Sequence, residues 1–115
     1  MKSLRVLLTG LLSFAFIGVF AQEKTDSFTV YGNCGMCKSR IEKAAKMDGV
    51  TAATWDKTTK ILTISFDSSK VTSEAVQKKV ASVGHDTALY TAQGEVYDKL
   101  PGCCKYERKA VPSKN

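Results

Sequence analysis

The feature that most constrains the fold is a pair of strand-like segments separated by a short polar stretch. Residues 61–66 alternate between apolar and polar side chains, with Leu62, Ile64 and Phe66 on one face. The preceding segment, residues 50–55, is rich in β-branched and aromatic residues, and the residues between the two segments are polar and turn-like. This pattern predicts a β-hairpin with one apolar face.

Helical patterns flank this hairpin on both sides. From residue 37 onward, apolar residues recur at helical spacing, and Gly49 stands where a helix could end. A second apolar stripe, made of three valines, runs through residues 72–83, where Thr72 or Ser73 is a suitable N-cap. The sequence therefore predicts one helix before the hairpin and one after it.

Short strands predicted at residues 28–31 and 87–90 complete the order strand, helix, strand, strand, helix, strand over residues 27–91. We therefore predict the α+β class. The expected architecture is a ferredoxin-like βαββαβ sandwich with two helices on one face of a four-stranded antiparallel sheet. Residues 22–26 are expected to be a polar lead-in, and residues 92–115 a basic, cysteine-containing C-terminal extension.

The first 21 residues have a different character from the rest. Residues 1–5 form a short basic segment, and residues 6–20 are almost wholly apolar. Ala21 then provides a small residue at a cleavage-like site. This arrangement is typical of a secretory signal peptide cut after Ala21, which predicts a periplasmic or secreted protein. An uncleaved anchor is the weaker interpretation, because the apolar run is shorter than the ~20 residues of a spanning helix.

The net charge of +6 is compatible with nucleic acid, an anionic surface or an acidic protein partner. Export argues against nucleic acid, and residues 60–66 lack the glycine–aromatic signature of RNA-recognition motifs, which share this element order. The first predicted helix carries four basic residues, Lys38, Arg40, Lys43 and Lys46. We expect them to form a solvated helix face, with docking to an acidic patch on a partner as the alternative.

Cys34 and Cys37 form a Cys-Gly-Met-Cys motif where a strand runs into a helix. Such a pair is a disulfide, a redox centre or a metal clamp. Cys37 opens the predicted helix, and the helix dipole together with Lys38 and Arg40 is expected to lower the thiol pKa there below about 8.5. Two thiolates on a loop suit Cu(I) in near-linear geometry, whereas Zn(II) prefers four ligands.

The stretch Gly-Asn-Cys-Gly-Met-Cys-Lys-Ser-Arg-Ile-Glu-Lys-Ala, the later Asp-Gly-Val and the Gly-His-Asp-Thr of residues 84–87 resemble the heavy-metal-associated (HMA) domain family. That family includes copper chaperones, N-terminal domains of copper-exporting ATPases and periplasmic mercury-binding proteins. The resemblance implies Cu(I) held by Cys34 and Cys37, with Hg(II) or Zn(II) as alternatives. It also implies a metal-donor or metal-acceptor partner such as a heavy-metal transporter, and a monomer, with a metal-bridged dimer as the alternative.

One departure from the family pattern is Gly32, where the family usually has a methionine that packs under the metal loop. We therefore expect the loop to be held less tightly here. The resemblance also places His85 close to Cys34 and Cys37. His85 is thus a candidate third ligand, and an ordinary loop residue is the alternative. Met36 is expected to be a packing or exposed contact rather than a ligand.

Cys103 and Cys104 are adjacent in the predicted extension. Neighbouring cysteines rarely bond to each other without strain, since their Cα atoms are only about 3.8 Å apart. Three interpretations stay open: a disulfide that ties the extension to the domain, an accessory or second metal site, or no role. If the extension folds back, one of these cysteines could complete a tetrahedral zinc site with Cys34, Cys37 and His85.

No Ser-His-Asp set, paired carboxylates or phosphate-binding loop is visible in the sequence, which argues against an enzyme. We therefore expect an exported soft-metal-binding protein that sequesters or transfers Cu(I) through its CxxC thiolate pair. The alternatives are a thiol–disulfide oxidoreductase that uses the same cysteines, or a mercury or zinc scavenger. The oxidoreductase is disfavoured because both prolines, Pro101 and Pro112, follow the βαββαβ unit and offer no cis-proline loop beside the motif.

Overall fold

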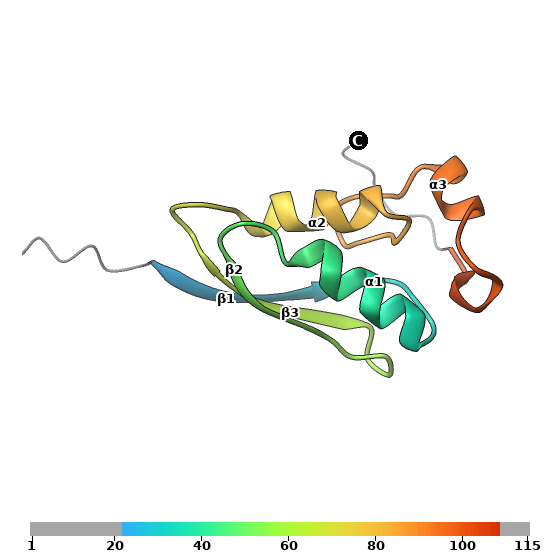
Figure 1. Ribbon diagram of the computed structural model, residues 1–115, viewed down its shortest axis with the longest axis horizontal. Helices are drawn as coiled ribbons and strands as arrows, with labels where there is room; N and C mark the ends of the chain where they lie inside the picture. Colours follow the sequence, from blue (N-terminus) through green and yellow to red (C-terminus); the bar gives the residue numbers. More distant parts are fainter. Residues whose placement is uncertain (1–21, 109–115) are drawn as a thin grey trace, which may run out of the picture.

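The computed structural model describes residues 22–108, which form a layer of helices on one face of a β-sheet (Figure 1). The predicted signal peptide and the last seven residues, 109–115, lie outside the described residues. No helix among residues 22–108 is long and apolar enough to cross a membrane.

The sheet has three antiparallel strands: β1 (Glu23–Thr29), β2 (Val50–Trp55) and β3 (Ile61–Asp67). β3 lies in the centre, with Leu62 paired to Phe28 of β1 and to Trp55 of β2. The predicted hairpin is therefore confirmed, and the alternation of apolar and polar residues in β3 reflects one buried face, as predicted. Leu62, Ile64 and Phe66 are all buried under the helices, while the residues between them are more exposed.

β1 begins earlier than the sequence indicated, because most of the expected polar lead-in pairs with β3. Glu23 lies opposite Asp67, and Asp26 lies opposite Ile64. The first five residues of β1 are all exposed. A strand with both faces in water needs no apolar alternation, and its backbone hydrogen bonds leave no signature in the sequence.

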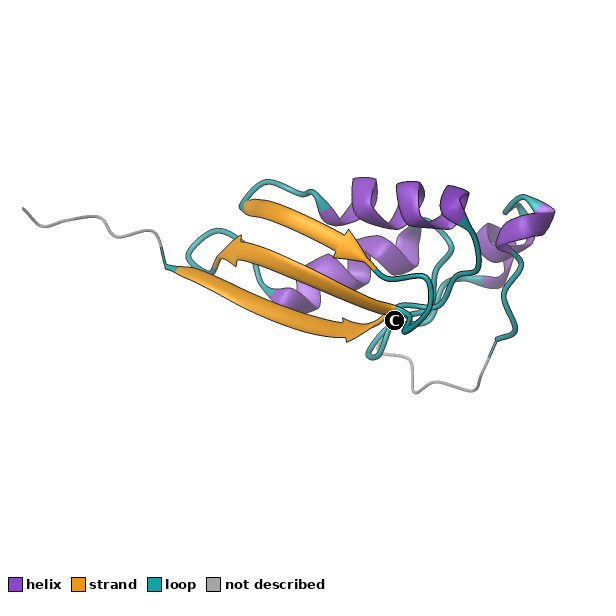
Figure 2. Cartoon of the chain, turned by 90° about the horizontal axis from the view of Figure 1, so that it is seen from below, coloured by secondary structure: helices purple, strands orange, loops and turns teal. Residues whose placement is uncertain are grey.

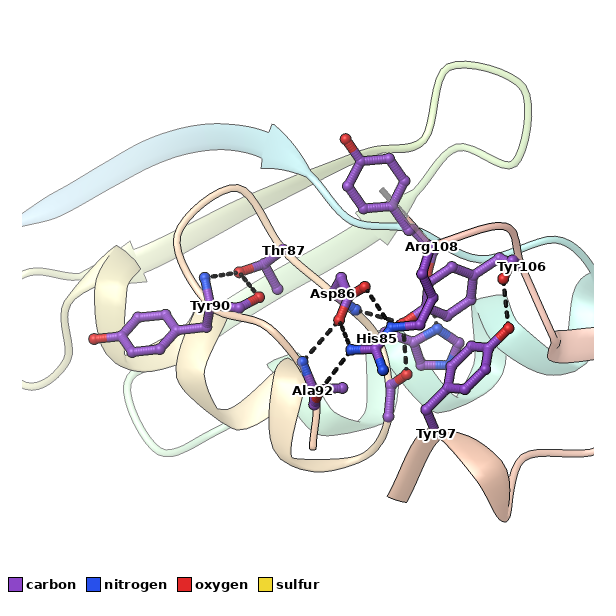
Figure 3. Close-up of polar contacts among 10 residues, drawn as sticks. His85, Asp86, Thr87, Tyr90, Ala92, Tyr97, Tyr106 and Arg108 are labelled. Carbon is purple, nitrogen blue, oxygen red and sulfur yellow. Dashed lines mark hydrogen bonds and ion pairs between the residues drawn. The ribbon is translucent and has the colours of Figure 1, made fainter. Parts of the chain in front are cut away.

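The predicted fourth strand is absent from the described residues, so the prediction of a four-stranded sheet is wrong: the sheet has three strands. Only Thr87 pairs beside β1, through an isolated antiparallel bridge to Val30. The Thr87 N–H donates to the Tyr90 carbonyl at 2.8 Å, and the Tyr90 N–H donates to Thr87 Oγ1 at 3.0 Å. Because the backbone folds into this local turn, residues 87–90 cannot extend along β1 (Figure 3).

Two helices, α1 (Gly35–Ala45) and α2 (Ser73–Ser82), lie side by side on one face of the sheet (Figures 1 and 2). The Thr72 side chain accepts a hydrogen bond from the Ala75 N–H at 3.0 Å, as predicted for an N-cap. Val76 and Val80 are fully buried against the sheet, whereas Val83 is partly buried. Gly49 and Gly84 have positive φ angles of 96° and 112°, which glycine adopts without strain.

Residues 92–108 fold back over the end of the domain and carry the short helices α3 (Gly94–Asp98) and η1 (Gly102–Cys104). The hydroxyl of the buried Tyr106 donates to the Gly84 carbonyl and accepts from the Asp86 N–H, both at 2.8 Å. The tail therefore docks onto the loop after α2 (Figure 3), and η1 contacts α1.

Candidate metal centre

The CxxC motif lies where the first turn of α1 begins. Cys34 is the N-cap residue with extended backbone, and Cys37 sits inside the first turn. The two sulfur atoms are 3.5 Å apart. Cys34 is partly exposed, whereas Cys37 is fully buried beneath the loop. The local fold thus presents one accessible and one sheltered sulfur.

The tail brings both of its cysteines to this motif. Cys34 Sγ lies 3.1 Å from Cys103 Sγ and 3.5 Å from Cys104 Sγ, and the two tail sulfurs are 3.9 Å apart. The sulfur atoms of Cys34, Cys37 and Cys104 all lie within 4.8 Å of one another. All four cysteines are free thiols, so hydrogen bonds and packing hold the tail in place without a disulfide.

The thiols differ in acidity because their surroundings differ. The hydrogen bond between Cys34 and Cys103 stabilises the Cys34 thiolate and lowers its pKa to about 6. Burial penalises the charged form of Cys37 and raises its pKa to about 11. Burial likewise raises the pKa of Cys104. The lowering of the pKa predicted at Cys37 is therefore wrong, because burial has the largest effect there. The thiol whose pKa falls is Cys34, and the main cause is its hydrogen bond with Cys103.

His85 is buried next to the centre but is separated from the sulfur atoms by Arg40. Its Nδ1 lies 2.8 Å from the Tyr31 carbonyl, which can only accept, so Nδ1 carries the proton. Nε2 then faces Arg40 Nη1 at 3.5 Å. Burial lowers the pKa of His85 and favours the neutral imidazole. Since Arg40 stands at Nε2, His85 would need Arg40 to move before it could ligate a metal.

Arg40 contacts the thiol cluster directly. This contact differs from the prediction that Arg40 lies on a solvated helix face. Its guanidinium donates to Cys104 Sγ at 3.2 Å, where it can balance thiolate charge. The sequence did carry a signal for this contact, because Arg40 is three residues after Cys37 and residues three apart share one face of a helix. Lys38 is partly exposed and bonds within the domain, through an ion pair with Glu42 and a hydrogen bond to the Trp55 carbonyl. Only Lys43 and Lys46 of the four predicted basic residues are exposed.

The loop is supported at Gly32 in a way that differs from the expectation of a loosely held loop. A Cβ placed on Gly32 would lie 3.2 Å from the ring of Trp55 and 3.1 Å from Cys37 Cβ. The Trp55 ring therefore lies where a side chain at position 32 would have to go. In addition, the ammonium of Lys60 donates to the Gly32 carbonyl at 2.6 Å. Trp55 and Lys60 together fasten the strand that enters the motif.

Comparison with known proteins identifies the domain. A sequence model of the heavy-metal-associated domain matches residues 32–86. A copper-exporting P-type ATPase of Staphylococcus saprophyticus is 41% identical over 54 residues. The aligned part covers 46% of this chain and 7% of the ATPase, so the likeness concerns one small domain of that transporter.

Solved structures agree with this result. The CopZ metallochaperone is 30% identical with a TM-score of 0.54, and the match covers 56% of this chain and 98% of CopZ. A copper-ion-binding protein of Bacillus anthracis is 25% identical with a TM-score of 0.56, over 58% of this chain and 97% of its own.

The water-soluble region of the P-type ATPase CopA of Bacillus subtilis is 30% identical with a TM-score of 0.55, over 59% of this chain and 46% of its own. The match to CopZ spans almost all of that protein. In this chain the order β1, α1, β2, β3, α2 of the predicted core is found. This chain therefore belongs to the heavy-metal-associated domain family.

Proposed function

We propose that this chain is an exported protein that binds Cu(I) through Cys34 and Cys37, with Cys104 as a third ligand from the tail. It holds the ion outside the cytoplasm or hands it to a partner. The single observation that carries the proposal is the convergence of these three sulfur atoms within 4.8 Å at the start of α1.

The donor set supports a soft monovalent ion, because thiolate ligands select Cu(I) over harder metals. With metal–sulfur bonds of about 2.3 Å, three sulfurs around one ion would lie about 4 Å apart. The sulfur atom of Cys34 lies 3.5 Å from the sulfur atoms of Cys37 and Cys104, so small movements suffice to accommodate the ion. Arg40 beside Cys104 offsets part of the thiolate charge.

Transfer is proposed to start at Cys34. This sulfur is the most acidic of the four and partly exposed, so an incoming thiolate from a partner could reach an ion there. A heavy-metal transporter is the proposed class of partner, since relatives carry copper-exporting and copper-ion-binding names. The exposed Lys43 and Lys46 would face an acidic patch on that partner.

The proposed location outside the cytoplasm rests on residues 1–21 alone, with their basic start, apolar run and small residue Ala21. N-terminal sequencing of the protein recovered from an expressing bacterial host tests this point. A mature chain beginning at Gln22 is expected, and a chain retaining its first residues would contradict export by a cleaved signal peptide.

Anaerobic competition for Cu(I) against a chromophoric chelator tests the function, with Zn(II) and Hg(II) measured in parallel. Cys34→Ser and Cys37→Ser are each expected to weaken Cu(I) binding by more than about 100-fold, beyond the usual cost of losing an outer contact. Ser39→Ala, on the exposed side of α1, is the matched control and should change nothing.

Unchanged Cu(I) affinity in both cysteine variants would refute the proposal. Preference for Zn(II) or Hg(II) over Cu(I) would reassign the ion to the scavenger alternative. Reduction of insulin disulfides at rates typical of thioredoxins would favour the oxidoreductase.

A further inference from the structure

A fifth sulfur atom joins the thiol cluster at its outer edge. The thioether of Met36 lies 3.6 Å from Cys103 Sγ. Met36 is 54% exposed and is the one large apolar side chain that the described residues leave in water. An exposed methionine whose sulfur faces a thiol is unusual for a simple packing contact, because burial is what normally stabilises this side chain.

The five sulfur atoms divide by depth into two sets that share Cys34. The inner set contains Cys34, Cys37 and Cys104, of which the last two are fully buried. It ends at Arg40, which donates to Cys104. The outer set contains Cys34, the exposed Cys103 and the exposed Met36. Cys34 is within 3.5 Å of sulfur atoms in both directions.

We propose that the centre binds two Cu(I) ions bridged by the Cys34 sulfur: one in the inner set, the other held by Cys34, Cys103 and Met36. The inference rests on the proposed function in that it takes Cu(I) as the ion. It adds a second site and assigns Met36 as a ligand of that site.

The number of donors favours two ions over one. A soft monovalent ion is satisfied by two or three sulfur donors, so five donors exceed what a single Cu(I) uses. Cys103 and Cys104 are adjacent, yet their sulfurs are 3.9 Å apart and lie on the exposed and the buried side of Cys34. A thiolate sulfur keeps lone pairs after binding one ion, so Cys34 can bind both.

Charge also favours a second cation. Metal binding by the inner set converts its thiols to thiolates, which repel each other at one helix start, and the guanidinium of Arg40 donates to Cys104. A second Cu(I) between Cys34 and Cys103 would offset the charge of the pair that lies closest, at 3.1 Å.

Native mass spectrometry and X-ray absorption of the anaerobically loaded chain test the inference. Two Cu(I) ions per chain are expected, together with a short copper–copper scattering vector. Cys103→Ser should hold one ion and lose that vector. Met36→Leu should bind the second ion about tenfold more weakly or worse. Met47→Leu, which changes a methionine outside the cluster, is the matched control and should still hold two.

The outcomes separate the two proposals. One ion per wild-type chain without copper–copper scattering refutes the second site and leaves the proposed function standing, and no bound Cu(I) refutes both. Two ions retained by Cys103→Ser, or an unchanged affinity of Met36→Leu for the second Cu(I) ion, also overturn the inference. Both substitutions fall on exposed side chains, and circular dichroism of each variant verifies that the fold is retained.

Discussion

The guanidinium of Arg108 makes two hydrogen bonds to the buried carboxylate of Asp86, from Nε at 3.0 Å and from Nη2 at 2.7 Å (Figure 3). Nη2 also donates to the Ala92 carbonyl at 2.6 Å. The pair thus ties the end of the described chain to the loop that follows α2. Because Asp86 has no exposed surface, water cannot hydrogen-bond to its carboxylate, and these protein partners take that place.

Arg108→Met is therefore expected to lower the free energy of unfolding by about 3 kcal/mol, since it leaves a buried carboxylate without its cation. Urea unfolding followed by circular dichroism measures the change. Lys99→Met removes the same charge from an exposed position on the tail and should be nearly neutral. Equal stability of the two variants would show that Arg108 does not hold the tail.

The contact between Trp55 and Gly32 makes a second prediction. Gly32→Ala places a methyl group 3.1–3.2 Å from Cys37 and the Trp55 ring, so overpacking should cost about 1–2 kcal/mol. Trp55→Phe removes the ring atoms at this contact, and with them the indole bond to the Val30 carbonyl. The double variant should lose less stability than the sum of the single variants, by about 1 kcal/mol.

Gly35→Ala is the control for this cycle, because no atom lies within 4 Å of an added Cβ there. It sits in the first turn of α1 and is expected to be neutral or slightly stabilising. Additive costs of Gly32→Ala and Trp55→Phe would contradict the proposed contact.

His85 makes stability depend on pH. Its pKa in the folded protein is lowered by burial, so on acidification the unfolded chain takes up the proton first. The free energy of unfolding should therefore fall as the pH drops below about 6.5. His85→Asn keeps a donor near the Tyr31 carbonyl and should flatten this dependence. The chain has a single histidine, so no other imidazole contributes.

This comparison is best made in a Cys34→Ser background, because the Cys34 thiol also titrates near pH 6 and would add to the slope. Identical pH profiles for the two proteins in that background would show that His85 is not desolvated as described.

The sequence predicted the parts of the fold whose signals are local. The alternation of residues 61–66 and the valine stripe of α2 each report a buried face, and both are found as expected. The outer half of β1 and the loss of the fourth strand leave no such signal. One is a strand exposed on both faces, and the other depends on a turn closed between Thr87 and Tyr90.

The candidate site follows the same division. Cys34 and Cys37 are three residues apart at the start of one helix, so their pairing could be predicted. The approach of Cys103 and Cys104 depends on long-range contacts of Tyr106 and Arg108, which no periodicity encodes. The acidity of Cys37 was mispredicted for a related reason, because burial is a property of the whole fold.

The hydrogen bond between Cys34 and Cys103 makes the last prediction. Because it lowers the pKa of Cys34 to about 6, alkylation of Cys34 by iodoacetamide in the metal-free protein should reach half its maximal rate near that pH. Cys103→Ala should move the midpoint upward, toward the value of about 8.5 for a free thiol. Cys103→Ser keeps a hydroxyl that can donate, so its midpoint should stay lower than that of the alanine variant. Peptide mass spectrometry assigns the modified cysteine, and an unchanged midpoint in Cys103→Ala would mean that the tail does not activate this thiol.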